Sequence, residues 1–274
     1  MIQSVERAAV ILSVLGSGTP RLGVTEIADR VGLAKPTVHG LLRTLVTHDL
    51  VTQDPASGKY SLGAGVLRLG NAYLDGSELR ACSLPWAQSL AQQAGEAVWV
   101  ATLSGTQVIV LHHMFRPVST ARPVSTAPSE NTALSENTVQ ILEVGAAVPW
   151  HACALGHAIV AYLPDDEVTR VLAAERSPLT GRTKTSRAAL IQALGRVRRR
   201  GYAIEDQEAT VGDAGIAAPI IGGDGRVTGA IGLVGPAGRL LAPDARDGLA
   251  QAVTASALSV SHDLSTGRET HPCR

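Results

Sequence analysis

Residues 32–45 read GLAKPTVHGLLRTL, and this stretch decides the fold of the first part of the chain. Gly32 is typical of the left-handed residue that ends a helix. Pro36 suits the first turn of a following helix, because its missing N–H would have no partner there. The apolar residues of that second helix recur at the spacing of a buried helical face. They are Val38, Leu41, Leu42 and Leu45. The stretch therefore predicts two helices joined by a short turn.

A hairpin follows this pair of helices. The turn signal Asp54-Pro55-Ala56-Ser57-Gly58 separates two short runs of strand-forming residues. Two helices are expected upstream of the third, one with Ser4 as its N-cap and one over about residues 25–31. Three helices and a hairpin predict a winged helix-turn-helix domain over residues 1–63.

The rest of the chain mixes helix and strand signals. Residues 64–95 read mostly as helix, which predicts a helical linker, and residues 96–264 read as a mixed α/β domain. We therefore expect an α+β protein that ends in a disordered tail, residues 265–274. The expected strands are 97–103, 107–114, 141–144, 216–221 and 226–234, and the expected helices are 150–163, 186–200 and one capped by Asp244 that ends at Leu264.

Tandem repeats mark residues 116–139. RPVSTA occurs twice in succession from residue 116, and SENT occurs at 129–132 and again at 135–138. Repeats rich in Ser, Thr and Pro bury little apolar surface. This segment is therefore predicted to be a mobile surface insertion in the second domain.

Composition limits the classes of protein to which this chain can belong. The chain has 274 residues, of which 45% are hydrophobic and 18% charged, enough for one large or two modest cores. No apolar run of about 18 residues and no secretion signal is present, which predicts a cytoplasmic protein without membrane contact. Three cysteines without a C-x-x-C argue against a disulfide scaffold or zinc ribbon.

Charge leaves nucleic-acid binding open. The first 80 residues hold eight Lys and Arg against seven Asp and Glu, and the whole chain has a net charge of zero. A general polyanion binder would be more basic, but a sequence-specific reader needs only a few cations on one face.

The sequence lacks the common motifs of catalysis and metal binding. The chain has no G-x-S-x-G, no P-loop and no G-x-G-x-x-G after a strand, so we expect neither an enzyme nor a cofactor. None of the four central histidines forms an i,i+4 pair, which argues against a metal site. They are His112, His113, His151 and His157, and each is either a donor to an anionic ligand or a structural histidine.

An ordered set of segments resembles the IclR family of bacterial transcriptional regulators. The segments are SVERA (4–8), EIA (26–28), GLAKPTVH (32–39), DPASGKY (54–60), LG (62–63), HACALGHA (151–158), RGYA (200–203), AAPI (217–220) and GP (235–236). The resemblance implies a winged-helix domain, a helical linker used in dimerisation and a GAF-like sensor domain for a small metabolite. It also implies a homodimer or homotetramer on palindromic double-stranded operator DNA.

Two further segments resemble a subgroup of this family, the actinobacterial glycerol-operon regulators. They are HHMFRP (112–117) and QILEVG (140–145). That resemblance implies an effector related to glycerol, with glycerol 3-phosphate as the expected molecule.

The polar face of the third helix is the expected DNA-reading surface. We assign to DNA contact Lys35, Pro36, Thr37, His39, Gly40, Arg43 and, on the wing, Lys59. Arg43 is suited to guanine and Lys35 to phosphate, while an ordinary solvated face is the alternative. Gly40 stands where arginine is common in the family. It either allows close approach to DNA or reflects drift.

The resemblance also places an effector cavity in the second domain. The assigned residues are His151, Ala154, Leu155, Glu205, Asp213, Gly215, Gly232 and Val234. Gly215 stands where a cysteine is frequent, and Gly232 and Val234 where serines often hold a carboxylate. These departures predict a roomier, less hydroxylic pocket and argue against a small keto acid. They also leave an alternative, a constitutive winged-helix dimer that binds DNA or protein without an effector.

Overall fold

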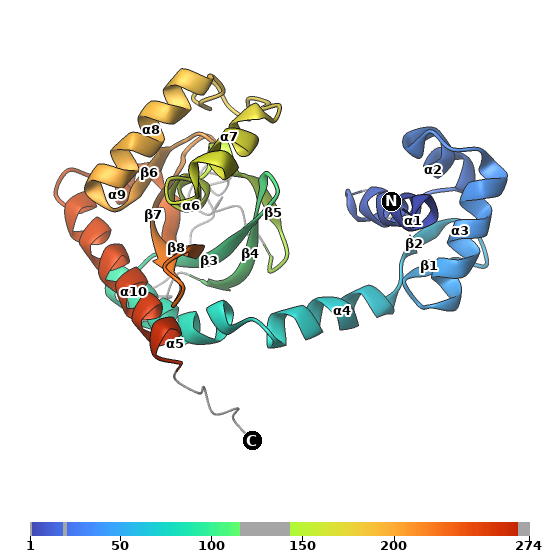
Figure 1. Cartoon of the computed structure of the whole chain (residues 1–274), viewed down its shortest axis with the longest axis horizontal. Helices are drawn as coiled ribbons and strands as arrows, with labels where there is room; N and C mark the ends of the chain where they lie inside the picture. Colours follow the sequence, from blue (N-terminus) through green and yellow to red (C-terminus); the bar gives the residue numbers. More distant parts are fainter. Residues whose placement is uncertain (1, 19–20, 116–142, 268–274) are drawn as a thin grey trace, which may run out of the picture. The chain divides into compact units, whose positions relative to one another are not determined.

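The computed structural model describes residues 2–18, 21–115 and 143–267. These residues form two compact units, divided between Gly76 and Ser77 (Figure 1). The repeats at 116–139 lie outside the described residues. Of the tail predicted from residue 265, the first three residues are described, and two of them belong to the last helix.

Unit 1 is a winged helix-turn-helix followed by one more helix, as the sequence predicted for its first part. Its elements are α1 (Gln3–Gly16), α2 (Val24–Val31), α3 (Lys35–Thr47), β1 (Val51–Gln53), β2 (Tyr60–Leu62) and α4 (Ala64–Asp75). Gly32 ends α2 with a φ of 66°, and Pro36 lies in the first turn of α3. The expected cap at Ser4 is wrong, because α1 already begins at Gln3 and no side chain caps it.

The core of unit 1 is apolar and continuous through all three helices. Ile11 of α1, Ile27 of α2 and Leu42 of α3 are each 0% exposed. Burial of such side chains contributes about 1.5–3 kcal/mol each. This core fixes the angle between α2 and α3, and with it the direction of the exposed face of α3.

The wing is held by its turn and by the segment before α2. The carboxylate of Asp54 accepts hydrogen bonds from the Ala56 N–H (3.1 Å) and the Ser57 hydroxyl (2.6 Å). Leu22 and Tyr60 exchange backbone hydrogen bonds of 2.9 and 2.8 Å, which adds a bridge to the β1–β2 hairpin. The pKa of Asp54 is lowered by these hydrogen bonds, most of all by that from Ser57, and by the nearby charge of Arg21. The turn is therefore held by an ionised carboxylate at neutral pH.

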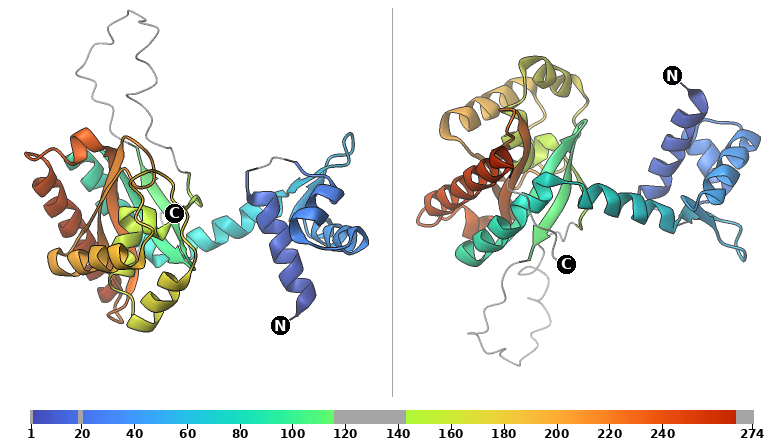
Figure 2. Two further views of the ribbon diagram at one scale, coloured as in Figure 1. Left: turned by 90° about the horizontal axis from the view of Figure 1, so that it is seen from above. Right: turned by 60° about the horizontal axis from the view of Figure 1, so that its bottom comes forward.

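In the described part of unit 2, one antiparallel sheet has the order β5-β4-β3-β8-β7-β6. Its strands are β3 (Ala97–Ser104), β4 (Gln107–Met114), β5 (Ala147–Pro149), β6 (Ala203–Asp206), β7 (Asp213–Ile221) and β8 (Val227–Pro236). Its helices are α5 (Glu78–Ala94), α6 (Ala154–Val160), α7 (Asp165–Ala173), α8 (Arg187–Arg200), α9 (Ala237–Leu240) and α10 (Arg246–Thr266). Helices α5 and α10 line one face of the sheet and α6 the other (Figures 1 and 2).

Several predicted elements of unit 2 need correction. The expected strand at 141–144 is wrong in its described part, since Val144 lies in a turn and β5 comes later. The expected helix at 150–163 is divided into a 3₁₀ turn, Trp150–Ala152, and α6. Asp244 does not cap α10, because Ala245 occupies the N-cap position.

The stretch expected as one helical linker, residues 64–95, is two helices. Helix α4 belongs to unit 1, while α5 belongs to unit 2 and packs along α10. The indole Nε1 of Trp86 donates to Asp263 across this pair (2.8 Å). The apolar positions of α5 are buried against unit 2, so this helix is part of the sheet domain.

Helix α6 lies unusually close to the segment before it. A Cβ atom at Gly156 would overlap the carbonyl oxygen of Trp150 and lie 2.5 Å from its Cα. On the sheet side, a Cβ atom at Gly215 would lie 3.0 Å from the Cβ of Ala154. Small residues at these points let the first turn of α6 rest directly on the sheet.

We expect Gly156→Ala to destabilise unit 2 by about 3 kcal/mol, because the methyl group meets rigid backbone. Thermal unfolding should show a fall of about 2–4 °C for each kcal/mol. The matched control is Gly195→Ala in α8, where a Cβ meets only the end of the Arg199 side chain at 3.7 Å. That variant should gain roughly 0.5–1 kcal/mol. Equal melting temperatures for the two variants would contradict the close approach at α6.

Candidate DNA-binding surface and ligand cavity

The residues assigned to DNA contact lie on exposed surface of unit 1. On α3, Val38 and Leu42 are buried, while Thr37, His39 and Arg43 are exposed. Lys35 and Pro36 are exposed at the start of this helix, Gly40 is exposed within it and Lys59 lies in the exposed turn of the wing. The structure therefore gives the predicted face the exposure it needs, and the exposed cations are available for phosphate or base contact.

Gly40 has no structural reason to be glycine within the described residues. A Cβ atom at this position would meet nothing within 4 Å, and the backbone is helical. A glycine inside a helix costs roughly 0.5–1 kcal/mol relative to alanine. Neither packing nor conformation offsets this cost, which leaves an external contact or drift as explanations.

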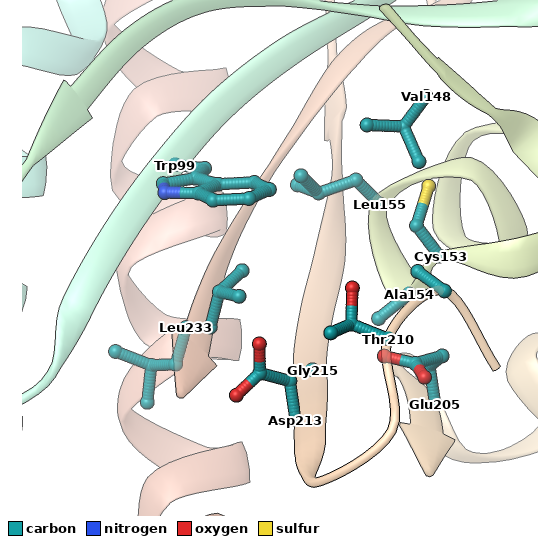
Figure 3. Close-up of a pocket in the computed structure, with 12 residues that line it drawn as sticks. Trp99, Val148, Cys153, Ala154, Leu155, Glu205, Thr210, Asp213, Gly215 and Leu233 are labelled. Atoms are coloured by element: carbon teal, nitrogen blue, oxygen red, sulfur yellow. The ribbon is translucent and has the colours of Figure 1, made fainter. Parts of the chain in front are cut away.

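Unit 2 holds a small cavity between the start of α6 and strands β6, β7 and β8 (Figure 3). The volume open to the centres of water molecules is about 40 Å³. Six of the eight residues assigned to effector binding line it. They are Ala154, Leu155, Glu205, Asp213, Gly215 and Val234.

His151 and Gly232, the other two assigned residues, are not in the lining. The ring nitrogen Nε2 of His151 pairs with the carbonyl oxygen of Ser177 (3.1 Å), and the side chain is 4% exposed. At Gly232 the space beside the backbone is filled by Ala217 of the neighbouring strand, whose Cβ would lie 2.7 Å from an added Cβ. Both positions therefore support the surrounding fold.

The cavity has a polar end and an apolar end. Figure 3 shows Glu205, Thr210 and Asp213 gathered at one end, with Trp99 and Leu155 facing each other at the other. Six further lining residues were not predicted from the sequence: Trp99, Val148, Cys153, Ala209, Thr210 and Leu233. Trp99 lies on a strand expected to be core, and Thr210 lies in a loop without any motif, so no local signal could have assigned them.

Glu205 is a strongly perturbed carboxyl group of the lining. It is 6% exposed, and its carboxylate accepts a hydrogen bond from the backbone N–H of Glu208. Burial, reinforced by the nearby charge of Glu208, raises the pKa of Glu205 to about 8. Lys184 forms an ion pair with Glu208, so its charge is already neutralised beside the cavity. Glu205 is therefore largely protonated at neutral pH.

The loop between β6 and β7 is held from outside the cavity. The hydroxyl of Thr180 donates to the carbonyl oxygen of Gln207 (2.7 Å), and that of Thr183 donates to the carbonyl oxygen of Glu208 (2.6 Å). Gln207 has a φ of 58°, a conformation that non-glycine residues rarely adopt. These bonds fix the loop that places Thr210 and Asp213 in the lining.

His157 and Cys153 behave as structural groups. His157 Nε2 pairs with the carbonyl oxygen of His151 (2.9 Å), and burial lowers the pKa of His157 to about 4, which keeps it neutral. The Sγ of Cys153 accepts the Gly156 N–H (3.4 Å), and burial raises the pKa of the thiol to about 12. His112 and His113 lie on β4, outside the cavity lining.

Two further features concern the described residues alone. They contain no group of three or more His, Cys, Asp or Glu side chains placed to hold a metal ion. None of their helices combines the length and hydrophobicity that crossing a membrane requires.

A winged helix-turn-helix unit joined to a sheet domain with a small internal cavity defines a DNA-binding protein with a candidate sensor domain. Comparison with known families agrees. The IclR helix-turn-helix domain matches residues 4–55, and the C-terminal domain of the bacterial transcriptional regulator IclR matches residues 130–262.

Relatives cover almost the whole chain. The glycerol operon regulatory protein of Streptomyces griseus is 42% identical over 269 residues, which span 97% of this chain and 98% of the relative. The protein of the same name from Streptomyces coelicolor is 41% identical, with the same coverage. The crystal structure of an IclR transcriptional regulator from Silicibacter sp. TM1040 superposes with a TM-score of 0.78 at 26% identity, covering 96% of each chain. This chain belongs to the IclR family of transcriptional regulators, as the sequence resemblance predicted.

Glu205 predicts a pH-dependent stability. The carboxyl group titrates at about 8 in the folded protein and at its ordinary value of 4.5 when unfolded, so the folded state holds a proton that the unfolded state has lost between these pH values. Stability contributed by this site is therefore lost as the pH rises from about 5 to about 9.

We expect Glu205→Gln, which cannot ionise, to match the parent near pH 5 and to exceed its melting temperature by several degrees near pH 9. The thermal transition of unit 2 should be followed by circular dichroism across this range, with Asp206→Asn as a control on the same strand. If the Gln variant and the parent change in parallel with pH, Glu205 is not the buried titrating group.

Proposed function

We propose that this regulator controls genes for the use of glycerol or a closely related three-carbon metabolite, and that such a metabolite binds in the cavity of unit 2. Two relatives that cover almost the whole chain are named for the glycerol operon. The observation that carries the proposal is the cavity itself, because six of the family-assigned positions converge on it. Glycerol 3-phosphate is the effector that the sequence suggests, and free glycerol is the other member of the same class.

The proposed DNA-binding mode follows from unit 1. Helix α3 enters the major groove, where Arg43 contacts a base edge and His39 and Thr37 contact a base or phosphate. Lys35 and Lys59 contact phosphates on either side. Two copies of unit 1 in a homodimer or homotetramer then read the two halves of a palindromic operator.

Coupling between metabolite and DNA requires differential binding. A metabolite changes operator affinity only if it prefers one arrangement of the dimer's DNA-binding units over another. The cavity suits this role, because a ligand beside the β6–β7 loop contacts a segment with a defined and restrained conformation.

Replacing Arg43 by alanine should weaken operator binding by roughly 1–3 kcal/mol, about a 5- to 150-fold rise in Kd, if its guanidinium group reads a base. Fluorescence anisotropy on the chain's own upstream DNA at fixed salt measures this. Arg68→Ala removes the same charge from an exposed position of α4 and should change Kd much less. Equal losses for both variants, or no preference over random DNA, would remove α3 as the reading helix.

The variant Gly40→Ala distinguishes the two explanations for this glycine, close approach to DNA and evolutionary drift. The added methyl group should raise the thermal stability of unit 1 by roughly 0.5–1 kcal/mol. If the DNA backbone approaches at this point, operator affinity falls although the fold is more stable. Gly70→Ala in α4 is the matched control, since a Cβ there also meets nothing within 4 Å. It should gain stability without a change in affinity, and the same behaviour at Gly40 would indicate drift.

A further inference from the structure

An ionised carboxylate lies on the wing, the part of unit 1 that is proposed to contact DNA phosphate beside α3. Asp54 begins the wing turn and accepts hydrogen bonds from the Ala56 N–H and the Ser57 hydroxyl. These bonds, most of all that from Ser57, lower the pKa of Asp54, so its carboxylate is charged at neutral pH. A negative charge at this place opposes the approach of the negative DNA backbone. The group that holds the wing turn therefore disfavours the proposed contact.

Lys59, the wing cation assigned to phosphate, lies directly across the hairpin from this carboxylate. Gln53 and Tyr60 are partners in the β1–β2 register, and the next pair toward the turn is Asp54 and Lys59. The N–H of Asp54 donates to the carbonyl oxygen of Lys59 (2.8 Å). Directly opposite residues of an antiparallel pair share a face, with Cβ atoms roughly 4.5–5.5 Å apart. Asp54 is thus placed where it could take the Lys59 ammonium group as its ion-pair partner.

The structure pairs Asp54 with a different cation. The Nη1 of Arg21 donates to the Oδ2 of Asp54 at 2.8 Å, although the two residues are 33 positions apart in the sequence. Among the described residues, no acidic group lies within ion-pairing distance of the Lys59 ammonium group. Arg21 therefore neutralises the carboxylate and leaves the charge of Lys59 available to an external anion.

The backbone holds Arg21 beside the wing. Its neighbour Leu22 forms an antiparallel bridge with Tyr60 of β2, and both of these side chains are buried in the core of unit 1. Successive residues of an extended segment point to opposite faces, so Arg21 lies on the outer face, where its side chain is 60% exposed. The charge that neutralises Asp54 therefore comes from a fixed point of the fold.

We propose that Arg21 is a positioning residue for DNA binding, which neutralises Asp54 and so keeps Lys59 free to bind a phosphate of the operator. Arg21 itself makes no DNA contact in this scheme. The inference rests on the proposed function, in which Lys59 of the wing contacts the DNA backbone. It assigns a role to a residue outside both the recognition helix and the hairpin. Without Arg21, the opposite charges of Asp54 and Lys59 cancel, and the wing loses its attraction for phosphate.

The test is operator binding by the full-length protein, measured by fluorescence anisotropy over a range of salt concentrations. Arg21→Gln should raise Kd about five- to tenfold at about 0.1 M salt for each wing in contact with DNA, the counterion-release contribution of one phosphate contact. The slope of log Kd against log salt concentration should fall by about 0.9 for each wing. Lys59→Gln, which removes the wing contact itself, should give a loss of the same order. Arg21→Lys keeps a cation beside Asp54 and should retain most of the affinity.

A second substitution separates the proposed role from a direct DNA contact and from a structural one. Adding Asp54→Asn to Arg21→Gln removes the uncompensated negative charge, so Kd should return to within about twofold of the parent value. A lost DNA contact or a loosened wing would not be restored by this change. The matched control is Asp49→Asn in the same Arg21→Gln protein. It removes an exposed carboxylate of unit 1 that is paired with Arg68 outside the wing turn, and it should give no recovery.

The failures of this inference and of the proposed function give different results. Unchanged affinity of the Arg21→Gln variant overturns the inference alone, and so does a loss that Asp54→Asn does not recover. A loss on Arg43→Ala without any loss on Lys59→Gln would retain the reading helix and refute both the wing contact and this inference. If the parent protein shows no preference for its upstream DNA over random DNA, the proposed DNA-binding mode and the inference that rests on it are both refuted.

Discussion

The close approach of α6 to Trp150 is the constraint on which unit 2 depends. With no side chain at Gly156, the first turn of α6 lies against the backbone of the preceding 3₁₀ turn. The same turn brings Ala154 onto the sheet beside Gly215, and the buried His157 ring then meets the carbonyl oxygen of His151 at 2.9 Å. The height of α6 above the sheet sets the volume of the cavity, so one small residue controls both packing and the binding space.

Unit 1 also depends on rigid packing, which here supports the surface expected to contact DNA. Its apolar core fixes α3, and the ionised Asp54 fixes the wing, so cations on both elements project from a rigid support. Preorganisation of this kind lowers the entropy that binding would otherwise cost. A nearly neutral chain can therefore read DNA through a few well-placed side chains, which is why net charge alone was uninformative.

The sequence was most informative where local rules decide structure. Gly32, Pro36 and the apolar spacing of α3 predicted the helix-turn-helix, and Gly201 ends α8 in the left-handed conformation as expected. It failed where tertiary contacts decide. The apolar run from Trp150 looks like one long helix, yet it is divided at Cys153, which has an extended backbone. Helix α5 reads as a connector because its partner, α10, lies more than 150 residues away in sequence.

The candidate site shows the same division. The structure brings family-matched positions such as Glu205 and Asp213 together in the lining of one cavity, because a shared fold carries shared positions. The ion pairs that set the charge of that cavity could not be predicted from the sequence. Whether a lining is acidic depends on which cations are already paired, and the commitment of Lys184 to Glu208 and of Arg239 to Glu96 appears only in three dimensions. The charge that a ligand meets in such a cavity therefore depends on pairings that the sequence does not show.

The position of Thr210 shows how ligand binding can alter a regulator of this construction. Thr210 belongs to the loop between β6 and β7, and that loop is bonded to Thr180 and Thr183, outside the cavity. The loop also contains the unfavourable φ of Gln207, so its conformation is retained only while the surrounding bonds hold. A ligand that contacts this loop in one conformation stabilises that conformation relative to any other. Differential stabilisation of one state is the thermodynamic requirement for an effector.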